Sequence, residues 1–121
     1  MKICLYIGSA MASLSIIFGA FGAHLIKSKV SVENLNIFET GVRYQMYHSL
    51  GIMLIGIIGF HVPHSIIRTS ASLLFFGTLI FSGSLYILVL ANIRWMGAIT
   101  PIGGIFLVLG WLNLFYNIYR H

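Results

Sequence analysis

The sequence predicts an all-α membrane protein, a four-transmembrane-helix bundle with a short interfacial amphipathic helix between spans one and two. Three observations lead to this fold class. Hydrophobic residues make up 59% of the 121 residues and charged residues only 7%, against roughly 25% charged in a soluble domain. The apolar residues gather in four runs, each long enough as a helix to cross about 30 Å of hydrocarbon. Short polar breaks separate the runs.

Each run is expected to be one helix. Backbone groups inside lipid must find partners in a helix or in a closed barrel, and barrel strands are only about ten alternating residues long. The predicted spans are approximately 3–26, 41–60, 71–93 and 96–119, in a single membrane domain over residues 1–121. The first run is longer than the apolar stretch of a signal peptide, roughly 7–15 residues, so we expect a retained span.

The break before the second span is the longest polar segment, and it holds both acidic residues. Ser31 precedes Val32, Leu35 and Phe38, which recur at helical spacing. This pattern predicts the short amphipathic helix at the membrane surface. In the fourth span, Pro101 lies near the start, where its missing N–H costs least.

Small residues recur at seven-residue intervals within the spans. Seven residues are nearly two helical turns, so each row lies on one helix face and allows another helix to approach closely. We expect these rows to serve packing within the bundle rather than a dedicated dimer face. The rows are Gly8, Ser15 and Gly22, then Gly77, Ser84 and Ala91, then Gly97 and Gly104.

The net charge of +5 does not indicate a nucleic-acid partner. The seven cations lie singly near the ends of spans, whereas Glu33 and Glu39 are the only acids. Basic residues at membrane edges contact headgroups and influence orientation, so membrane lipids are the expected partners. The cations divide almost equally between the two sides and assign no orientation. Cys4 is the only cysteine and forms no intrachain disulfide.

A polar cluster lies at the entry to the second span. Glu39, Arg43 and Tyr47 are spaced i, i+4 and i+8, and Tyr44 and His48 form the neighbouring i, i+4 pair, so all five occupy adjacent ridges of one helix. Ionisable groups within a membrane span are expected to turn toward the interior of the bundle or toward water. Because successive spans cross the membrane in opposite directions, the end of the first span, with His24, lies on the same side of the membrane as this cluster. The connection between the third and fourth spans, with Arg94, lies on that side too. The predicted ligand-binding residues are therefore His24, Glu39, Arg43, Tyr44, Tyr47, His48 and Arg94.

Four roles stay open for this cluster. It is a structural network, with an ion pair between Glu39 and Arg43, or it binds a lipid or small amphiphile whose anionic headgroup lies between Arg43 and Arg94. Alternatively, the protein is a small transporter or proton-conducting protein that acts as an oligomer. In the fourth case it is a structural or assembly partner of another membrane protein, held by its small-residue faces.

Catalytic and cofactor chemistry find little support in the sequence. His24 and His48 are imaginable haem ligands, but nothing else indicates haem. Histidines without a cysteine pair or an HExxH motif make zinc binding weak, and a Ser–His–acid set is not recognisable. We expect no enzymatic activity, no cofactor and no metal.

Four motifs occur in order along the chain: residues 19–24 (GAFGAH), 39–48 (ETGVRYQMYH), 81–86 (FSGSLY) and 100–104 (TPIGG). Together they resemble the YgdD/YwdK-like family of small bacterial inner-membrane proteins, a "domain of unknown function" family. The resemblance covers almost the whole chain. It implies a multi-pass protein of the bacterial inner membrane with cytosolic termini and an outward-facing polar cluster. It carries over no established activity.

Overall fold

Every regular element of the structure, a computed structural model that describes residues 2–121, is helical. The predicted all-α class is therefore confirmed; Met1, the first residue of the predicted domain, lies outside the described residues. The first rod comprises α1 (Lys2–Ile16), a π-helical turn η1 (Ile17–Gly22) and α2 (Ala23–Ile26). Then follow α3 (Val32–Ile58), α4 (His64–Leu90), a short 3₁₀ segment η2 (Arg94–Ala98) and α5 (Thr100–Arg120).

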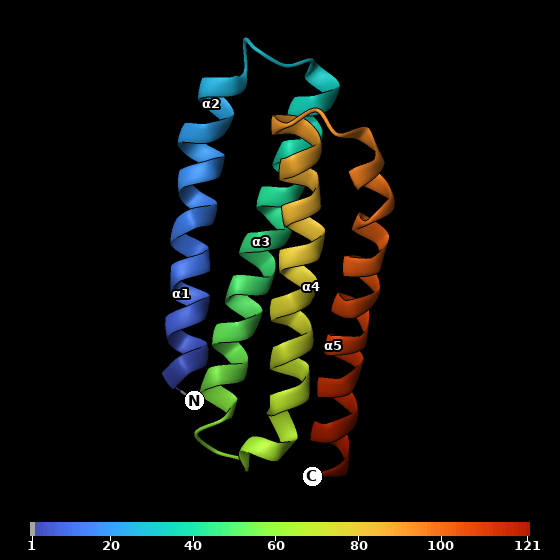
Figure 1. Ribbon diagram of the computed structural model, residues 1–121. Helices are drawn as coiled ribbons and strands as arrows, with labels where there is room; N and C mark the ends of the chain where they lie inside the picture. The colour runs from blue at the N-terminus through green and yellow to red at the C-terminus, as the bar shows by residue number, and fades with distance from the viewer. Residues whose placement is uncertain (1) are drawn as a thin grey trace.

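The long helices run up and down, so both termini lie at one end of the molecule (Figure 1). We call this the terminal end; it also holds the connection of residues 59–63. The far end holds the other two connections, residues 27–31 and 91–93, together with η2.

The predicted separate interfacial helix is not a separate element. The residues expected to form it are the first turns of α3, which continues without a break to Ile58. The Ser31 side chain accepts a hydrogen bond of 3.0 Å from the backbone N–H of Asn34. This N-cap satisfies one of the free amide groups at the helix start. Since no breaker follows Ser31, the amphipathic segment and the second apolar run form one helix.

Within residues 2–121, three helical segments are long and apolar enough to cross a membrane: residues 2–26, 64–90 and 94–120. The α3 helix has the same length as α4, 27 residues, but it is more polar. Some of its polar side chains are turned toward neighbouring helices, and Asn34, Gln45, His48 and Ser49 are buried. The central position of α3 therefore accounts for these buried polar residues.

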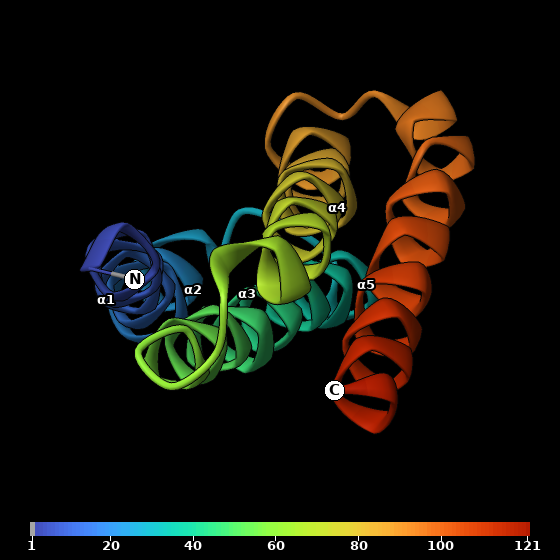
Figure 2. The same cartoon turned by 90° about the horizontal axis from the view of Figure 1, so that it is seen from below.

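The helices pack in the order of the chain. The α3 helix packs against α1 on one side and α4 on the other, and α5 packs mainly against α4. Figure 2 shows α5 splayed away from the first rod. One apolar core, with Ile52, Ile67 and Leu74, joins these helices toward the terminal end. A second core, around Phe38 and Leu88, lies toward the far end.

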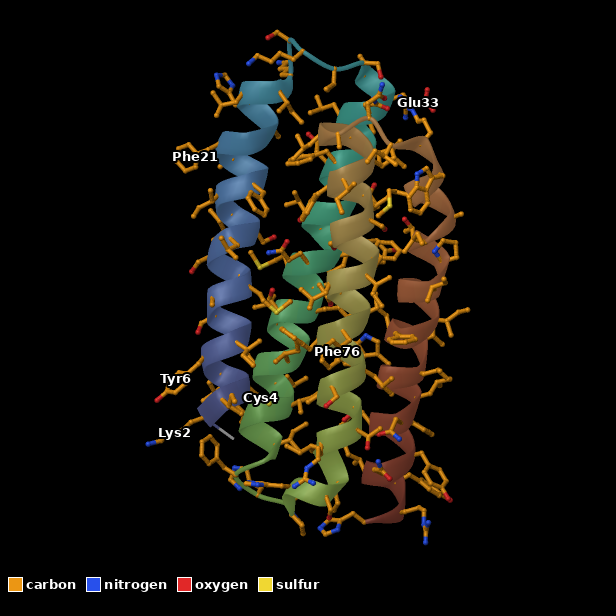
Figure 3. The ribbon with its side chains drawn as sticks, viewed as in Figure 1. Lys2, Cys4, Tyr6, Phe21, Glu33 and Phe76 are labelled. Atoms are coloured by element: carbon orange, nitrogen blue, oxygen red, sulfur yellow. The ribbon has the colours of Figure 1, made fainter. Side chains whose placement is uncertain are left out.

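The outer surface is rich in apolar side chains. Figure 3 shows Tyr6 and Phe21 pointing away from the first rod, whereas Cys4 turns toward α3. Tyr6 is 68% exposed and Cys4 is buried. Such a surface suits a lipid solvent, because apolar side chains lose nothing when acyl chains surround them.

The small-residue rows give close helix contacts for several of their members. A Cβ on Gly8 would lie 2.8 Å from the backbone oxygen of Ser49 in α3, and a Cβ on Gly77 would meet Leu107 of α5 at 2.9 Å. In α5, however, the tight position is Gly103, where a Cβ would lie 2.4 Å from the amide nitrogen of Phe81. Gly104 has ample room, because the nearest atoms are 3.9 Å away.

Candidate functional site: a groove between α3 and α5

The inward face of α3 is tied to both neighbours through Gln45. Its side-chain nitrogen donates to the carbonyl oxygen of Met11 in α1 at 2.8 Å, and its side-chain oxygen accepts from the hydroxyl of Tyr86 in α4 at 2.6 Å. Ser15 of α1 and Ser82 of α4 also donate to backbone carbonyls of α3, at 2.9 and 2.6 Å. No buried side-chain nitrogen or oxygen in residues 2–121 lacks a partner. These contacts hold α3 in a fixed rotation about its axis.

That rotation directs Tyr44 and His48 toward α5, into a groove between α3 and α5. The groove has a volume of about 570 Å³. Phe81 of α4 forms part of its wall, and α5 contributes a mostly apolar wall from one end to the other. The α5 residues include Pro101, Gly104, Ile105, Val108 and Trp111.

The side chains that α3 and α4 contribute to the groove wall are aromatic. The ring of Tyr44 stacks on that of Phe81 with 4.5 Å between centroids. On the α3 side, Tyr44 also stacks on His48 at 6.2 Å, and the His48 ring lies 5.9 Å from that of Trp111. An apolar wall with a few oriented polar groups is typical of small-molecule sites.

Both ring nitrogens of His48 have partners. Nε2 accepts a hydrogen bond from the indole N–H of Trp111 at 3.1 Å, because an indole only donates. Nδ1 lies 2.8 Å from the carbonyl oxygen of Tyr44, which only accepts, so Nδ1 carries the proton. The geometry thus assigns a neutral ring with its proton on Nδ1. A ring with this bonding has no free lone pair for a metal or haem iron.

Trp111 closes the groove toward the terminal end. Its ring lies over Gly51 of α3, where a Cβ would come within 2.8 Å of the indole Cη2. Glycine is therefore required for this close approach between the indole and the α3 backbone. His48 and Gly51 together fix the position of the indole.

The structure brings together only part of the predicted cluster. Tyr44 and His48 line the groove, and Tyr47 lies beside Tyr44 with 5.8 Å between ring centroids but is 55% exposed. Arg43 donates to Thr40 at 3.1 Å, and its exposed guanidinium makes no ion pair with Glu39 within the described part of the chain. The ion pair expected between these two residues is therefore not formed.

The remaining predicted residues lie outside the groove. His24 is exposed on α2, away from the lining of the groove. Arg94 donates from its guanidinium to the side-chain oxygen of Asn34 at 2.9 Å, which joins η2 to the start of α3. Neither residue is among those that line the groove.

Sequence reasoning missed Phe81, Gln45 and Trp111. Gln45 was visible as a polar residue within the cluster, but its two partners are distant in sequence. Trp111 lies within an unbroken apolar run and carries no local signal. Residues 2–121 contain no group of three or more His, Cys, Asp or Glu side chains able to hold a metal ion.

Comparison with known proteins shows the family of this chain. The model of the family described as "Protein of unknown function (DUF423)" matches residues 18–104. The chain belongs to this family. The family expected from the four sequence motifs is thereby confirmed, since the relatives include the membrane protein YwdK of Bacillus subtilis, 38% identical over 115 residues and 94% of each chain.

Staphylococcal relatives are similarly close. The membrane protein SSP2132 of Staphylococcus saprophyticus is 44% identical over 120 residues, covering 99% of both chains. The membrane protein SH2409 of Staphylococcus haemolyticus is 42% identical over 120 residues, covering 99% of this chain and 98% of its own. No solved structure matches. These relatives are named as membrane proteins, and their names assign no activity.

Proposed function

We propose that the protein is a four-span protein of the bacterial inner membrane that binds one anionic amphiphile without converting it chemically. Its acyl chain lies in the α3–α5 groove and its headgroup lies beside Arg43. The observation that carries this proposal is an aromatic and apolar groove of about 570 Å³ lined by Tyr44, together with an exposed cation, Arg43, whose guanidinium donates to Thr40 one turn from Tyr44.

The depth of the groove suits one acyl chain of one leaflet. Its α5 wall extends from Pro101 to Trp111, which is about 15 Å at 1.5 Å per residue. The hydrocarbon core is about 30 Å thick, so one leaflet contributes about half of that. A chain that enters near the membrane surface would therefore reach Trp111 at its end.

Arg43 supplies the charge that favours an anionic headgroup. Its guanidinium donates to Thr40, which lies one turn from Tyr44 toward the far end and on the same helix face. This contact uses one of the five guanidinium donors and leaves the others for a phosphate or carboxylate. Tyr47, exposed next to Tyr44, adds a hydroxyl near the same edge.

In this proposal α3 also crosses the membrane, in addition to the three apolar segments given above. Its polar residues are compatible with a span because Gln45, His48 and Ser49 are buried with hydrogen-bond partners. In the alternative, only three helices cross the membrane and α3 lies on its surface. That arrangement would remove α3 from between α1 and α4, where it packs over much of its length.

We place the termini in the cytosol, as the family resemblance implies. The cations do not decide the orientation, because Lys2, Arg68 and Arg120 at the terminal end are balanced by Lys27, Lys29 and Arg94 at the far end. The groove then opens toward the outer leaflet. A green fluorescent protein fused after His121 tests this, since it fluoresces in the cytosol and stays dark if the C-terminus is exported.

Native mass spectrometry from nanodiscs of phosphatidylglycerol and phosphatidylcholine tests the binding proposal. Wild type is compared with Arg43→Ala and with Gly104→Phe, which fills the groove from a position with open space. We expect one phosphatidylglycerol on wild type, a several-fold loss of that preference in Arg43→Ala, and loss of the adduct in Gly104→Phe.

A matched control is Gly83→Phe. Gly83 also has open space, with no atom within 4 Å of its Cβ position, but it lines a hollow between α1 and α4 instead. An adduct lost equally in both phenylalanine variants contradicts the assignment to the α3–α5 groove. Bare protein throughout favours the structural reading of the polar residues.

The masses in these spectra, together with two further measurements, distinguish the transporter and assembly-partner roles. A transporter that acts as an oligomer predicts a homo-oligomer mass and flux in liposomes that depends on His48. An assembly partner predicts bare monomer here and a second membrane protein when the complex is taken from native membranes.

A further inference from the structure

Trp111 stands between two hollows of the molecule. On its far-end side lies the α3–α5 groove, and on its terminal-end side lies a second hollow of about 350 Å³. Leu114, Phe115, Ile118 and Tyr119 of α5 line the second hollow, and Trp111 lines both. The indole is therefore the side chain that separates two apolar spaces along the same helix.

The indole is held in this separating position from two sides. Its N–H donates to His48 at 3.1 Å, and its outer edge lies against the backbone of α3 at Gly51. His48 is in turn fixed by its own hydrogen bond to the Tyr44 carbonyl. The indole therefore cannot rotate aside without breaking a hydrogen bond.

We propose that Trp111 is the specificity-determining residue that sets how long an acyl chain the groove accepts. This inference rests on the proposed function of the groove. A chain longer than the distance from Pro101 to Trp111 meets the indole. Without the indole, the hollow that extends to Tyr119 adds eight residues of helix, about 12 Å.

The test measures which chain lengths stay bound. Nanodiscs contain equal amounts of lysophosphatidylglycerol with lauroyl and stearoyl chains, and native mass spectrometry gives the ratio of the two adducts. Wild type should favour the lauroyl form at least about fivefold, the ratio that corresponds to ~1 kcal/mol of overpacking. Trp111→Ala should bring the ratio close to that of the surrounding membrane.

Trp95→Ala is the matched control, because Trp95 is also exposed but lies in η2 at the far end. It should retain the wild-type ratio. If Trp111→Ala does not fold, Trp111→Leu keeps an apolar side chain that is shorter than the indole and should still shift the ratio toward stearoyl.

The outcomes separate this inference from the proposed function. Adducts that are present in wild type and in folded Trp111 variants with the same chain ratio overturn the role of Trp111 and leave the groove as a binding site. No adduct on wild type for either chain overturns the proposed function, and the role of Trp111 with it.

Discussion

The indole N–H of Trp111 in α5 donates to Nε2 of His48 in α3, across 3.1 Å. These two helices otherwise have little contact with each other, because α3 packs between α1 and α4 and α5 packs mainly against α4. A polar bond between two helix side chains in lipid is worth about 0.6 kcal/mol on average and up to about 1.7. The pair therefore acts as a specific link across the groove rather than as the main source of bundle stability.

A double-mutant cycle measures that link. Trp111→Phe and His48→Leu each remove one partner, and the double variant removes both. We expect a coupling energy of about 0.6 kcal/mol in the free energy of unfolding, measured by reversible denaturation in mixed micelles. Additive effects of the two single variants would mean that the contact contributes nothing to stability.

Acidification should break the same bond. Nε2 accepts from Trp111 while His48 is neutral, and protonation turns that nitrogen into a second donor. The link is therefore present at higher pH and lost as the pH falls far enough to protonate His48. In a Trp95→Phe background, Trp111 fluorescence should change with acidification and recover on neutralisation. His48→Leu in that background should lack the transition; an identical transition there would assign it to another group.

Gln45→Leu should be among the most destabilising polar substitutions in α3. It removes the bond to Met11 and leaves the hydroxyl of the half-buried Tyr86 without its partner. An unsatisfied buried group costs about 1–3 kcal/mol. Adding Tyr86→Phe removes the orphaned hydroxyl and should restore part of the loss. Thermal unfolding in detergent checks both variants, and a double variant no better than Gln45→Leu would contradict this account.

Two adjacent glycines in α5 should respond differently to alanine. A Cβ on Gly103 would lie 2.4 Å from the Phe81 amide nitrogen, so α4 and α5 must separate, whereas a Cβ on Gly104 meets nothing closer than 3.9 Å. We expect Gly103→Ala to cost about 1–3 kcal/mol of unfolding free energy. Gly104→Ala should be neutral or slightly stabilising, because alanine favours the helix. Equal midpoints of thermal unfolding for the two variants would contradict the helix contact seen here.

The sequence allowed the helical class and the approximate helix positions to be predicted, because long apolar runs require internal hydrogen bonding. It did not reveal that residues 32–40 and the second apolar run form one continuous helix, α3. Apolar spacing from Val32 to Phe38 fits a separate surface helix as well as the first turns of a longer one. The difference depends on the absence of a breaker before Gly41 and on burial of Asn34 and Phe38 against other helices.

The candidate site was predictable only on one of its walls. Tyr44 and His48 stand out as polar and aromatic residues at i, i+4 spacing on one predicted helix. Trp111 and Phe81 meet them through docking of α4 and α5, and the rotation of those helices depends on distant contacts such as Gly103 against Phe81. Glu39 and Arg43 share the spacing of an ion pair, but the guanidinium bonds to Thr40 instead.

The π-helical turn of the first rod gives that rod an unusual tolerance to a change in length. Cys4, Gly8, Met11 and Ser15 keep alternating steps of four and three toward α3, and the next buried position is Ala23 rather than Gly22. The wider turn at 17–22 absorbs one extra residue, because its hydrogen bonds close over five residues instead of four. Deleting one residue within 17–22 would convert the turn to an ordinary α-helix and leave both halves facing α3. A deletion midway along Lys2–Ile16 would instead rotate the residues before it by about 100° relative to α3. This turn is therefore the place in the first rod where we expect the loss of one residue to leave the packing unchanged.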